Sequence, residues 1–141
     1  MEAQDLDEVL AIETVSFPNP WSRSLFESEL KNPISNLYVL NPGEGNKERI
    51  GAYIVFWMLH GEAHVLNIAT APDLRRTGLA RQLLEFSIAQ MRQSLVFEVF
   101  LEARKSNIAA LSLYKDMGFK ESYVRKKYYQ NEDAIVMTLE L

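Results

Sequence analysis

The sequence predicts a single α/β domain in which a central mixed sheet is flanked by helices. Three observations support this fold class. The chain has 141 residues, of which 48% are apolar, so it can bury one core of domain size. Strand-like and helical segments alternate along its second half, and no repeat, low-complexity tract or linker interrupts them. We therefore expect residues 1–141 to form one domain.

Two helices are expected before the first strand. Asp5 can cap the first, which runs over residues 5–15. Its stripe at helical spacing consists of Leu6, Val9, Leu10 and Glu13. The proline-containing segment 17–21 ends it. Ser22 can cap a second, short helix, which Asn32-Pro33 ends because proline cannot continue a helix.

The remaining elements follow from apolar patterning and turn residues. Strands are expected at residues 36–40, 50–59, 62–69, 96–103, 119–124 and 134–139. The segment 41–46 is interpreted as a polar turn, and His60-Gly61 as the turn of a hairpin. Helices are expected at residues 78–93 and 107–117, the second closed by Gly118 in a left-handed conformation. The segment 96–103 is apolar enough to lie centrally in the sheet.

The composition excludes several classes of function. Because the chain has no cysteine, a disulfide framework, a thiolate metal site and a cysteine nucleophile are excluded. The longest apolar run, at residues 52–59, is much shorter than the roughly 20 residues that cross a bilayer, so a cytoplasmic protein is expected. A formal charge of −4 argues against broad nucleic-acid binding. It suits a cationic substrate, although mild acidity also simply maintains solubility.

Residues 72–80 form the segment in which chemistry is most strongly indicated. A strand ends there, a polar turn follows, and Gly78 and Ala80 open a helix. The unpaired N–H groups of a first helical turn can bind phosphate, and Arg75 and Arg76 add positive charge. The segment is neither a Walker A loop nor a full dinucleotide fingerprint. From these residues alone, an ordinary strand-to-helix connection is an equally good interpretation.

The segment Arg75-Arg76-Thr77-Gly78-Leu79-Ala80 resembles the Gln/Arg-x-x-Gly-x-Gly/Ala signature of the GNAT superfamily of N-acetyltransferases. In that family the loop holds the pyrophosphate of coenzyme A. Other segments resemble the RimI-type ribosomal-protein-alanine N-acetyltransferases, in order along nearly the whole chain. These segments lie at residues 17–22, 62–69, 101–104, 107–110, 113–114, 118–119, 125–129 and 132–134. The resemblance implies a GNAT-like fold with acetyl-coenzyme A as cosubstrate and no metal.

The chain departs from the family pattern in three places. The family usually has a strand before its first helix, and here that strand is missing or vestigial, which puts the completeness of the sheet edge in question. Ala80 replaces the commoner final glycine of the signature, and Thr70 replaces a commoner valine. Both replacements are small, so we expect coenzyme binding to persist.

Two residues are candidates for acid–base chemistry. Glu102 follows the apolar run 99–101, where a strand should open into a cleft, and a carboxylate there can take a proton from an amine. A rim carboxylate paired with Arg104 is the alternative. Tyr114 lies two helical turns after Asn107, so both occupy one face of a helix, where core packing is the ordinary role of a tyrosine. The resemblance implies that Glu102 is the general base, Tyr114 the general acid and Asn107 a coenzyme contact.

The resemblance also implies the remaining site residues. The backbone of residues 67–70 should face the acetyl carbonyl. The coenzyme is expected to contact Ile68, Ala69, Thr70, Arg75, Arg76, Thr77, Gly78, Leu79, Ala80 and Asn107. The acceptor is expected to lie against Phe17, Trp21, Tyr128 and Tyr129, aromatic residues of a kind that also serve as ordinary packing. RimI-type enzymes take the N-terminal alanine of a small-subunit ribosomal protein, and the mild acidity of this chain suits such a basic partner.

Two other chemistries are set aside, and two rival functions remain. The segment His60-Gly61-Glu62-Ala63-His64 lacks the spacing of a helical zinc box, and a hairpin explains it better. No Gly-x-Ser-x-Gly elbow supports an acyl-enzyme, so direct transfer in a ternary complex is expected. The rivals are a GNAT enzyme acting on lysine or a small-molecule amine, and a non-catalytic coenzyme A-binding module. Such a module would need neither Glu102 nor Tyr114.

Overall fold

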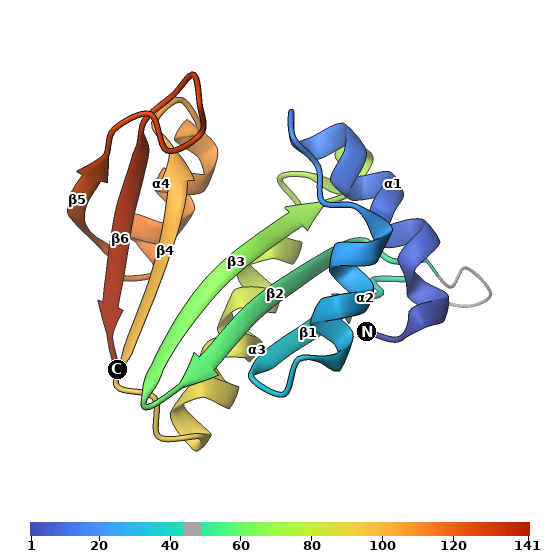
Figure 1. The fold of residues 1–141 in the computed structure, drawn as a ribbon, viewed down its shortest axis with the longest axis horizontal. Helices are drawn as coiled ribbons and strands as arrows, with labels where there is room; N and C mark the ends of the chain where they lie inside the picture. Colours follow the sequence, from blue (N-terminus) through green and yellow to red (C-terminus); the bar gives the residue numbers. More distant parts are fainter. Residues whose placement is uncertain (44–48) are drawn as a thin grey trace.

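The structure is a computed structural model that describes residues 1–43 and 49–141. Its strands are β1 (Ser35–Leu40), β2 (Ala52–Leu59), β3 (Glu62–Thr70), β4 (Glu98–Arg104), β5 (Lys120–Arg125) and β6 (Ala134–Glu140). They form one sheet in the order β1-β2-β3-β4-β6-β5 (Figure 1). Neighbouring strands are antiparallel except β3 and β4, which are parallel. The predicted α/β fold with a mixed sheet is therefore confirmed, and β4 is central.

Helices cover both faces of this sheet (Figure 1). On one face lie α1 (Leu6–Ser16) and α2 (Arg23–Lys31), which pack over β1, β2 and β3. On the other lie α3 (Leu79–Gln93), behind β1, β2 and β3, and α4 (Ile108–Asp116), behind β4 and β6. Short 3-10 turns at Ala3–Asp5 and Pro72–Leu74 precede α1 and α3. In the described residues no helix combines the length and apolarity needed to cross a membrane.

Each face of the sheet buries its own core. Ile54 and Phe56 of β2 pack toward α3, whereas Tyr53 and Val55 pack toward α1 and α2, and all four are fully buried. A strand covered on both sides needs apolar residues at every position. The continuous apolar run at residues 52–59 reflects this double coverage.

A β-bulge in β3 determines where the sheet opens. Val55 pairs with Asn67 and Phe56 with Val65, so Leu66 is the extra residue on β3. The bulge changes which face of the sheet the odd-numbered side chains point to. Val65 packs toward α3, whereas Ala69 packs toward α1. Parallel pairing with β4 ends at the bulge, and the two strands diverge beyond it (Figure 1).

Helix and turn predictions were largely confirmed, with one correction. Ser22 caps α2, since its Oγ accepts a hydrogen bond from the Leu25 N–H at 3.2 Å. Gly118 adopts the predicted left-handed conformation, with φ 99°. The predicted capping of the first helix by the Asp5 side chain was wrong. The Asp5 carboxylate accepts from the Glu2 N–H at 2.7 Å and closes the preceding 3-10 turn instead.

The sheet edge at β1 has no additional strand in the part of the chain that the structure describes. The residues before α1 form a 3-10 turn, and the Met1 amino group donates one hydrogen bond to the Leu37 carbonyl of β1 at 2.9 Å. Among the described residues, then, a 3-10 turn stands before α1 where the family usually has a strand. Of the predicted turn at residues 41–46, residues 44–46 lie outside the described residues.

Candidate active site

A two-part cleft opens where β3 and β4 diverge. The first part, the β3–β4 cleft, has a volume of about 360 Å³ and lies between the ends of these strands and the loops after α1 and β5. The second part, the α3–α4 cleft, has about 640 Å³ and lies between the end of β3, the start of α3 and one face of α4. Both parts are lined by Ser16, Phe17, Ile68, Asn107, Ala110 and Tyr114. The two parts therefore adjoin along a shared wall.

Glu102 lies on β4 in the β3–β4 cleft, and its two carboxylate oxygens have different surroundings. Its side chain is 6% exposed, and Oε2 lies 2.7 Å from Nε2 of His64. Oε1 is buried but accepts no hydrogen bond from any residue that the structure describes, and Arg125 approaches it only to 3.9 Å. Buried polar atoms without a partner are rare, and a catalytic role is one explanation for them. One oxygen is thus held in place while the other is available to a donor that enters the cleft.

The alternative role of Glu102 as a rim carboxylate paired with Arg104 was wrong. Arg104 pairs with Glu132 instead, at 3.3 Å, and its guanidinium lies 4.4 Å above the ring of Tyr129. This arrangement fixes the loop after β5 against the end of β4. The hydrogen-bond partner of Glu102 is therefore His64 and not Arg104.

His64 is a residue of the site that the sequence interpretation missed. It lies on β3 and pairs with Phe100 of the parallel strand β4. Phe100 is two residues before Glu102. Its ring stacks on Phe100 at a centroid distance of 4.2 Å, and its side chain is 21% exposed. Because a carboxylate only accepts hydrogen bonds, the His64 Nε2–H is the donor. Finding this pair from sequence would have required the register of β3 and β4. The hairpin interpretation of the segment itself is confirmed, since Leu59 pairs with Glu62.

Tyr114 lies on α4 at the wall that the two parts of the cleft share. It is buried, and its ring packs against Phe119 at a centroid distance of 5.8 Å. Burial, and secondarily the neighbouring Tyr129, raises the pKa of the Tyr114 phenol above its ordinary value. The phenol therefore keeps its proton at neutral pH. Asn107 caps the same helix, since its Oδ1 accepts from the Ala110 N–H at 3.2 Å.

The four predicted aromatic residues line the β3–β4 cleft from two loops. Phe17 and Trp21 come from the loop between α1 and α2, and Tyr128 and Tyr129 from the loop between β5 and β6. These loops stand on either side of the diverging strand ends (Figure 1). Burial and the nearby Glu102 charge raise the pKa of Tyr129 to about 12. The cleft is thus bordered by neutral aromatic surface on two sides.

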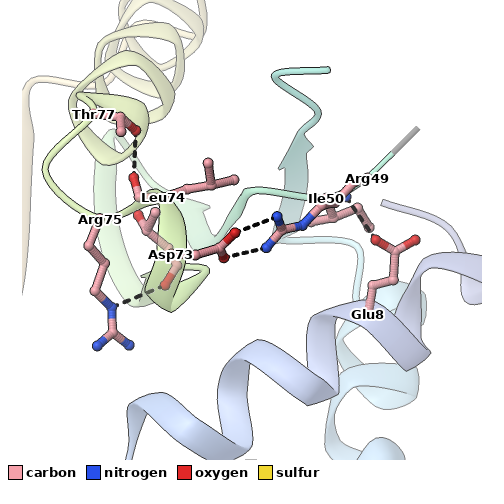
Figure 2. A network of polar contacts seen from close by, with 8 residues as sticks. Glu8, Arg49, Ile50, Asp73, Leu74, Arg75 and Thr77 are labelled. Atoms are coloured by element: carbon pink, nitrogen blue, oxygen red, sulfur yellow. Dashed lines mark hydrogen bonds and ion pairs between the residues drawn. The ribbon is translucent and has the colours of Figure 1, made fainter. Parts of the chain in front are cut away.

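A polar network fixes the start of the loop after β3 (Figure 2). Arg49 donates two hydrogen bonds to the Asp73 carboxylate, at 2.7 and 2.5 Å, and the hydrogen bond from Arg49 is the main cause of the lowered pKa of Asp73. The adjacent Ile50 N–H donates to Glu8 of α1 at 2.8 Å. These contacts connect the loop to the segment before β2 and to α1.

The rest of this loop is held by bonds to its own backbone and to α1. The Arg75 Nε–H donates to the Thr70 carbonyl at 3.3 Å, and the Arg75 Nη2–H to Ser16 Oγ at 3.1 Å. The Thr77 hydroxyl donates to the Leu74 carbonyl. Gly78 then precedes α3 with φ 87°, a conformation that favours glycine, and a Cβ placed there would meet no atom within 4 Å. Its backbone is therefore accessible from the α3–α4 cleft.

Nearly all predicted coenzyme residues line the α3–α4 cleft. These are Ile68, Ala69, Thr70, Arg75, Arg76, Gly78, Leu79, Ala80 and Asn107. Thr77 does not line it, because its hydroxyl is directed to the loop backbone. Arg81, which the sequence interpretation missed, lines the same cleft and pairs with Asp116 at 3.5 Å. Three arginines thus surround the first turn of α3. No group of three side chains suited to bind a metal occurs among the described residues.

Comparison with known proteins gives consistent matches over most of the chain. The profile of the Acetyltransferase (GNAT) family matches residues 6–119. The chain is 35% identical to the [ribosomal protein bS18]-alanine N-acetyltransferase of Escherichia coli K12, over 99% of this chain and 93% of that protein. It is 32% identical to the putative [ribosomal protein bS18]-alanine N-acetyltransferase of Bacillus subtilis strain 168, over 97% of this chain and 90% of that protein.

Solved structures agree with these matches. The crystal structure of the Escherichia coli ribosomal-protein-S18-alanine N-acetyltransferase matches with a TM-score of 0.87 and 35% identity, over 99% of this chain and 90% of that chain. Ard1 from Thermoplasma volcanium matches with a TM-score of 0.91 and 22% identity, over 100% of this chain and 94% of that chain, which supports the fold alone.

Proposed function

Since this chain belongs to the Acetyltransferase (GNAT) family, as its segments predicted, we propose that it acetylates the N-terminal alanine of ribosomal protein bS18. GNAT enzymes use acetyl-coenzyme A, which supplies the acetyl group as an activated thioester. One observation carries the proposal. A single two-part cleft contains a buried carboxylate with one free oxygen, Glu102, and a protonated phenol, Tyr114, on the shared wall. We propose that residues 1–141 form a single N-acetyltransferase domain. It would act in the cytoplasm and would need no metal.

The α3–α4 cleft suits the coenzyme. The first turn of α3 presents unpaired N–H groups, and Arg75, Arg76 and Arg81 supply the positive charge that a pyrophosphate requires. Gly78 leaves space beside the backbone for the phosphates. The same cleft continues along residues 68–70 of β3, whose backbone N–H groups would stabilise negative charge on the attacked carbonyl oxygen. Thr77 supports this loop through its backbone bond.

Glu102 would activate the acceptor amine. An N-terminal α-amine has a pKa near ~8, so at neutral pH most of it is protonated and cannot attack a thioester. Oε1 of Glu102, which is buried without a hydrogen-bond partner among the described residues, would accept an N–H of the incoming amine and take its excess proton. The hydrogen bond from His64 to Oε2 holds the carboxylate in this orientation, and the exposed edge of His64 connects it to solvent. His64 therefore acts as a positioning residue for the base.

Tyr114 would supply a proton to the leaving sulfur. Because burial raises its pKa, the phenol enters the reaction protonated at any pH at which the protein functions. The same buried surroundings disfavour a free thiolate, so the phenol O–H stabilises the departing sulfur as its charge develops. Direct transfer then needs no covalent bond to the enzyme.

The walls of the β3–β4 cleft suit an extended N-terminus. The flat rings of Trp21 and Tyr129 can hold backbone while leaving little room beside the first side chain, which favours alanine. The α-amine is also neutral more often than a lysine amine, whose pKa is about two units higher. Both features favour an α-amine over the lysine acceptor of the rival interpretation.

A peptide with two competing amines tests this proposal. A synthetic peptide with the N-terminal sequence of bS18 and one internal lysine is incubated with enzyme and acetyl-coenzyme A, and tandem mass spectrometry locates the acetyl group. We expect it on the alanine α-amine, with a large loss of rate when the first residue is tryptophan and a small loss when it is serine. Acetylation mainly on lysine, or equal rates for alanine and tryptophan, would contradict the N-terminal assignment.

A further inference from the structure

Glu13 is a buried carboxylate for which the proposed chemistry has no use. Glu13 lies in α1 on the stripe formed by Leu6 and Val9. It is 1% exposed and lines the β3–β4 cleft. No cation pairs with it in the part of the chain that the structure describes. A buried charge without a counter-charge is costly unless hydrogen bonds satisfy it. Its retention on an otherwise apolar stripe therefore calls for a reason.

Three neutral donors satisfy Glu13, and they come from three different elements. Oε1 accepts from the Tyr53 hydroxyl of β2 and from the Asn67 side-chain amide of β3, the latter at 2.6 Å. Oε2 accepts from the Trp21 backbone N–H, in the loop after α1, at 2.9 Å. The Glu13 carbonyl also accepts from the Phe17 N–H at 3.2 Å. A single residue thus connects two strands to the aromatic loop.

These contacts lie at the two points that set the width of the cleft. Asn67 directly follows the bulged Leu66, where β3 begins to diverge from β4. Trp21 belongs to the loop that forms the opposite aromatic wall. Because the same carboxylate accepts from both, the distance between the bulge and the loop is fixed by one side chain.

A second buried carboxylate provides a matched comparison. Glu29 of α2 is 6% exposed and accepts from the Trp57 Nε1–H at 3.1 Å and from the Asn32 amide at 3.2 Å. Its partners resemble those of Glu13, but Glu29 lines neither part of the cleft. It therefore separates the effect of losing a buried carboxylate from an effect on the cleft.

We propose that Glu13 is a positioning residue for the acceptor: it holds the Trp21 loop and the β3 bulge at the separation that binding of an N-terminus requires. The inference rests on the proposed function. Glu13 contacts neither the thioester nor the reacting amine, so it governs acceptor affinity through Trp21 and Asn67. A glutamine at this position has one acceptor oxygen in place of two, and can accept from at most two of the three donors.

The first test compares Glu13→Gln with Glu29→Gln in steady-state kinetics, using the bS18 N-terminal peptide. Glu13→Gln is expected to raise the KM for the peptide by about tenfold and to leave the KM for acetyl-coenzyme A within about twofold, since one buried donor loses its acceptor. Glu29→Gln should change neither KM. An unchanged peptide KM in Glu13→Gln, or equal changes in both KM values, would overturn the inference.

A second variant distinguishes positioning from general destabilisation. Adding Tyr53→Phe to Glu13→Gln removes a donor that competes with the Trp21 N–H for the single amide oxygen, and Asn67 can then rotate its amide to accept from the Gln N–H. The double variant should recover part of the lost peptide affinity. A purely structural role predicts that the two losses add, and a peptide KM higher than in the single variant would contradict positioning.

Hydrogen exchange separates this inference from the proposed function. The Trp21 amide proton, followed by NMR, should exchange faster in Glu13→Gln than in wild type and should be unchanged in Glu29→Gln. If wild-type protein acetylates no alanine peptide, the proposed function fails, whereas unchanged Trp21 exchange in Glu13→Gln overturns the role of Glu13. Faster exchange together with an unaltered peptide KM would equally overturn it.

Discussion

The two parts of the cleft are assembled from different kinds of chain. The α3–α4 cleft takes most of its lining from one stretch, residues 68–81, and from one face of α4. The β3–β4 cleft draws on α1, the loop between α1 and α2, β3, β4, α4 and the loop after β5. The first relies on backbone groups and exposed cations, and the second on buried side chains with long-range partners. Loss of the side chain that takes the proton in the β3–β4 cleft should therefore have the largest effect.

The largest effect is expected at the buried carboxylate. Glu102→Gln removes the group that takes the proton, so acetyl transfer should fall by about 10²–10⁴-fold, most strongly at low pH, where more of the amine is protonated. The affinity for acetyl-coenzyme A, measured by calorimetry, should change little because that ligand lies in the other part of the cleft. Wild-type turnover would remove this assignment and revive the non-catalytic coenzyme A-binding module.

A smaller loss is expected at the shared wall. Tyr114→Phe keeps the packing against Phe119 but removes the phenol proton, and transfer should slow by about 10²-fold. Because the pKa of Tyr114 is raised, its proton is present below the raised value and is lost only above it. The wild-type rate should therefore show no fall from this group up to pH ~10, the ordinary tyrosine value. A fall in rate well below that pH that disappears in Tyr114→Phe would contradict the assignment.

The α3–α4 cleft should respond to charge placed against its backbone. Gly78→Glu puts a carboxylate where phosphates are expected, and coenzyme affinity should fall by about tenfold or more. Gly78→Ala is the matched control, since it carries the same left-handed strain without charge. Calorimetry on both folded variants separates the two effects. Equal affinities for the glutamate and alanine variants would refute the phosphate placement.

The smallest effect is expected at the residue that orients the base. His64→Asn removes the Nε2–H bond to Glu102, and kcat should fall by about fivefold while the KM for coenzyme stays constant. A kcat equal to that of wild type would show that His64 serves packing against Phe100 only.

The same contrast explains what the sequence could predict. The segment from Arg75 to Ala80 is contiguous, so its order along the chain already contained the arrangement of loop, glycine and helix start. Glu102 could be found because an apolar strand directly precedes it. His64 meets Glu102 across 38 residues, and Glu13 meets Asn67 across 54, so their partners depend on strand register and helix docking. Local patterning does not encode either.

The capping error at Asp5 has a related cause. An aspartate just before a helical stripe is typical of an N-cap. Here a 3-10 turn precedes the helix, and the Asp5 carboxylate accepts a hydrogen bond from the Glu2 N–H at the start of that turn instead. Glu13 carried a signal that could have been used, since a carboxylate on a stripe with Leu6 and Val9 has to be buried. The spacing of Glu13 along the helix thus favours its burial, but it does not indicate its partners.

We propose that this two-part cleft transfers acetyl directly to the N-terminal alanine of bS18. The most direct measurement is intact-mass and tandem mass spectrometry of purified, unacetylated bS18 after incubation with acetyl-coenzyme A and either wild-type protein or Glu102→Gln. We expect one acetyl group on the N-terminal alanine with wild type, and almost none with the variant over the same time. Unmodified bS18 with both proteins, or equal acetylation by both, would contradict it.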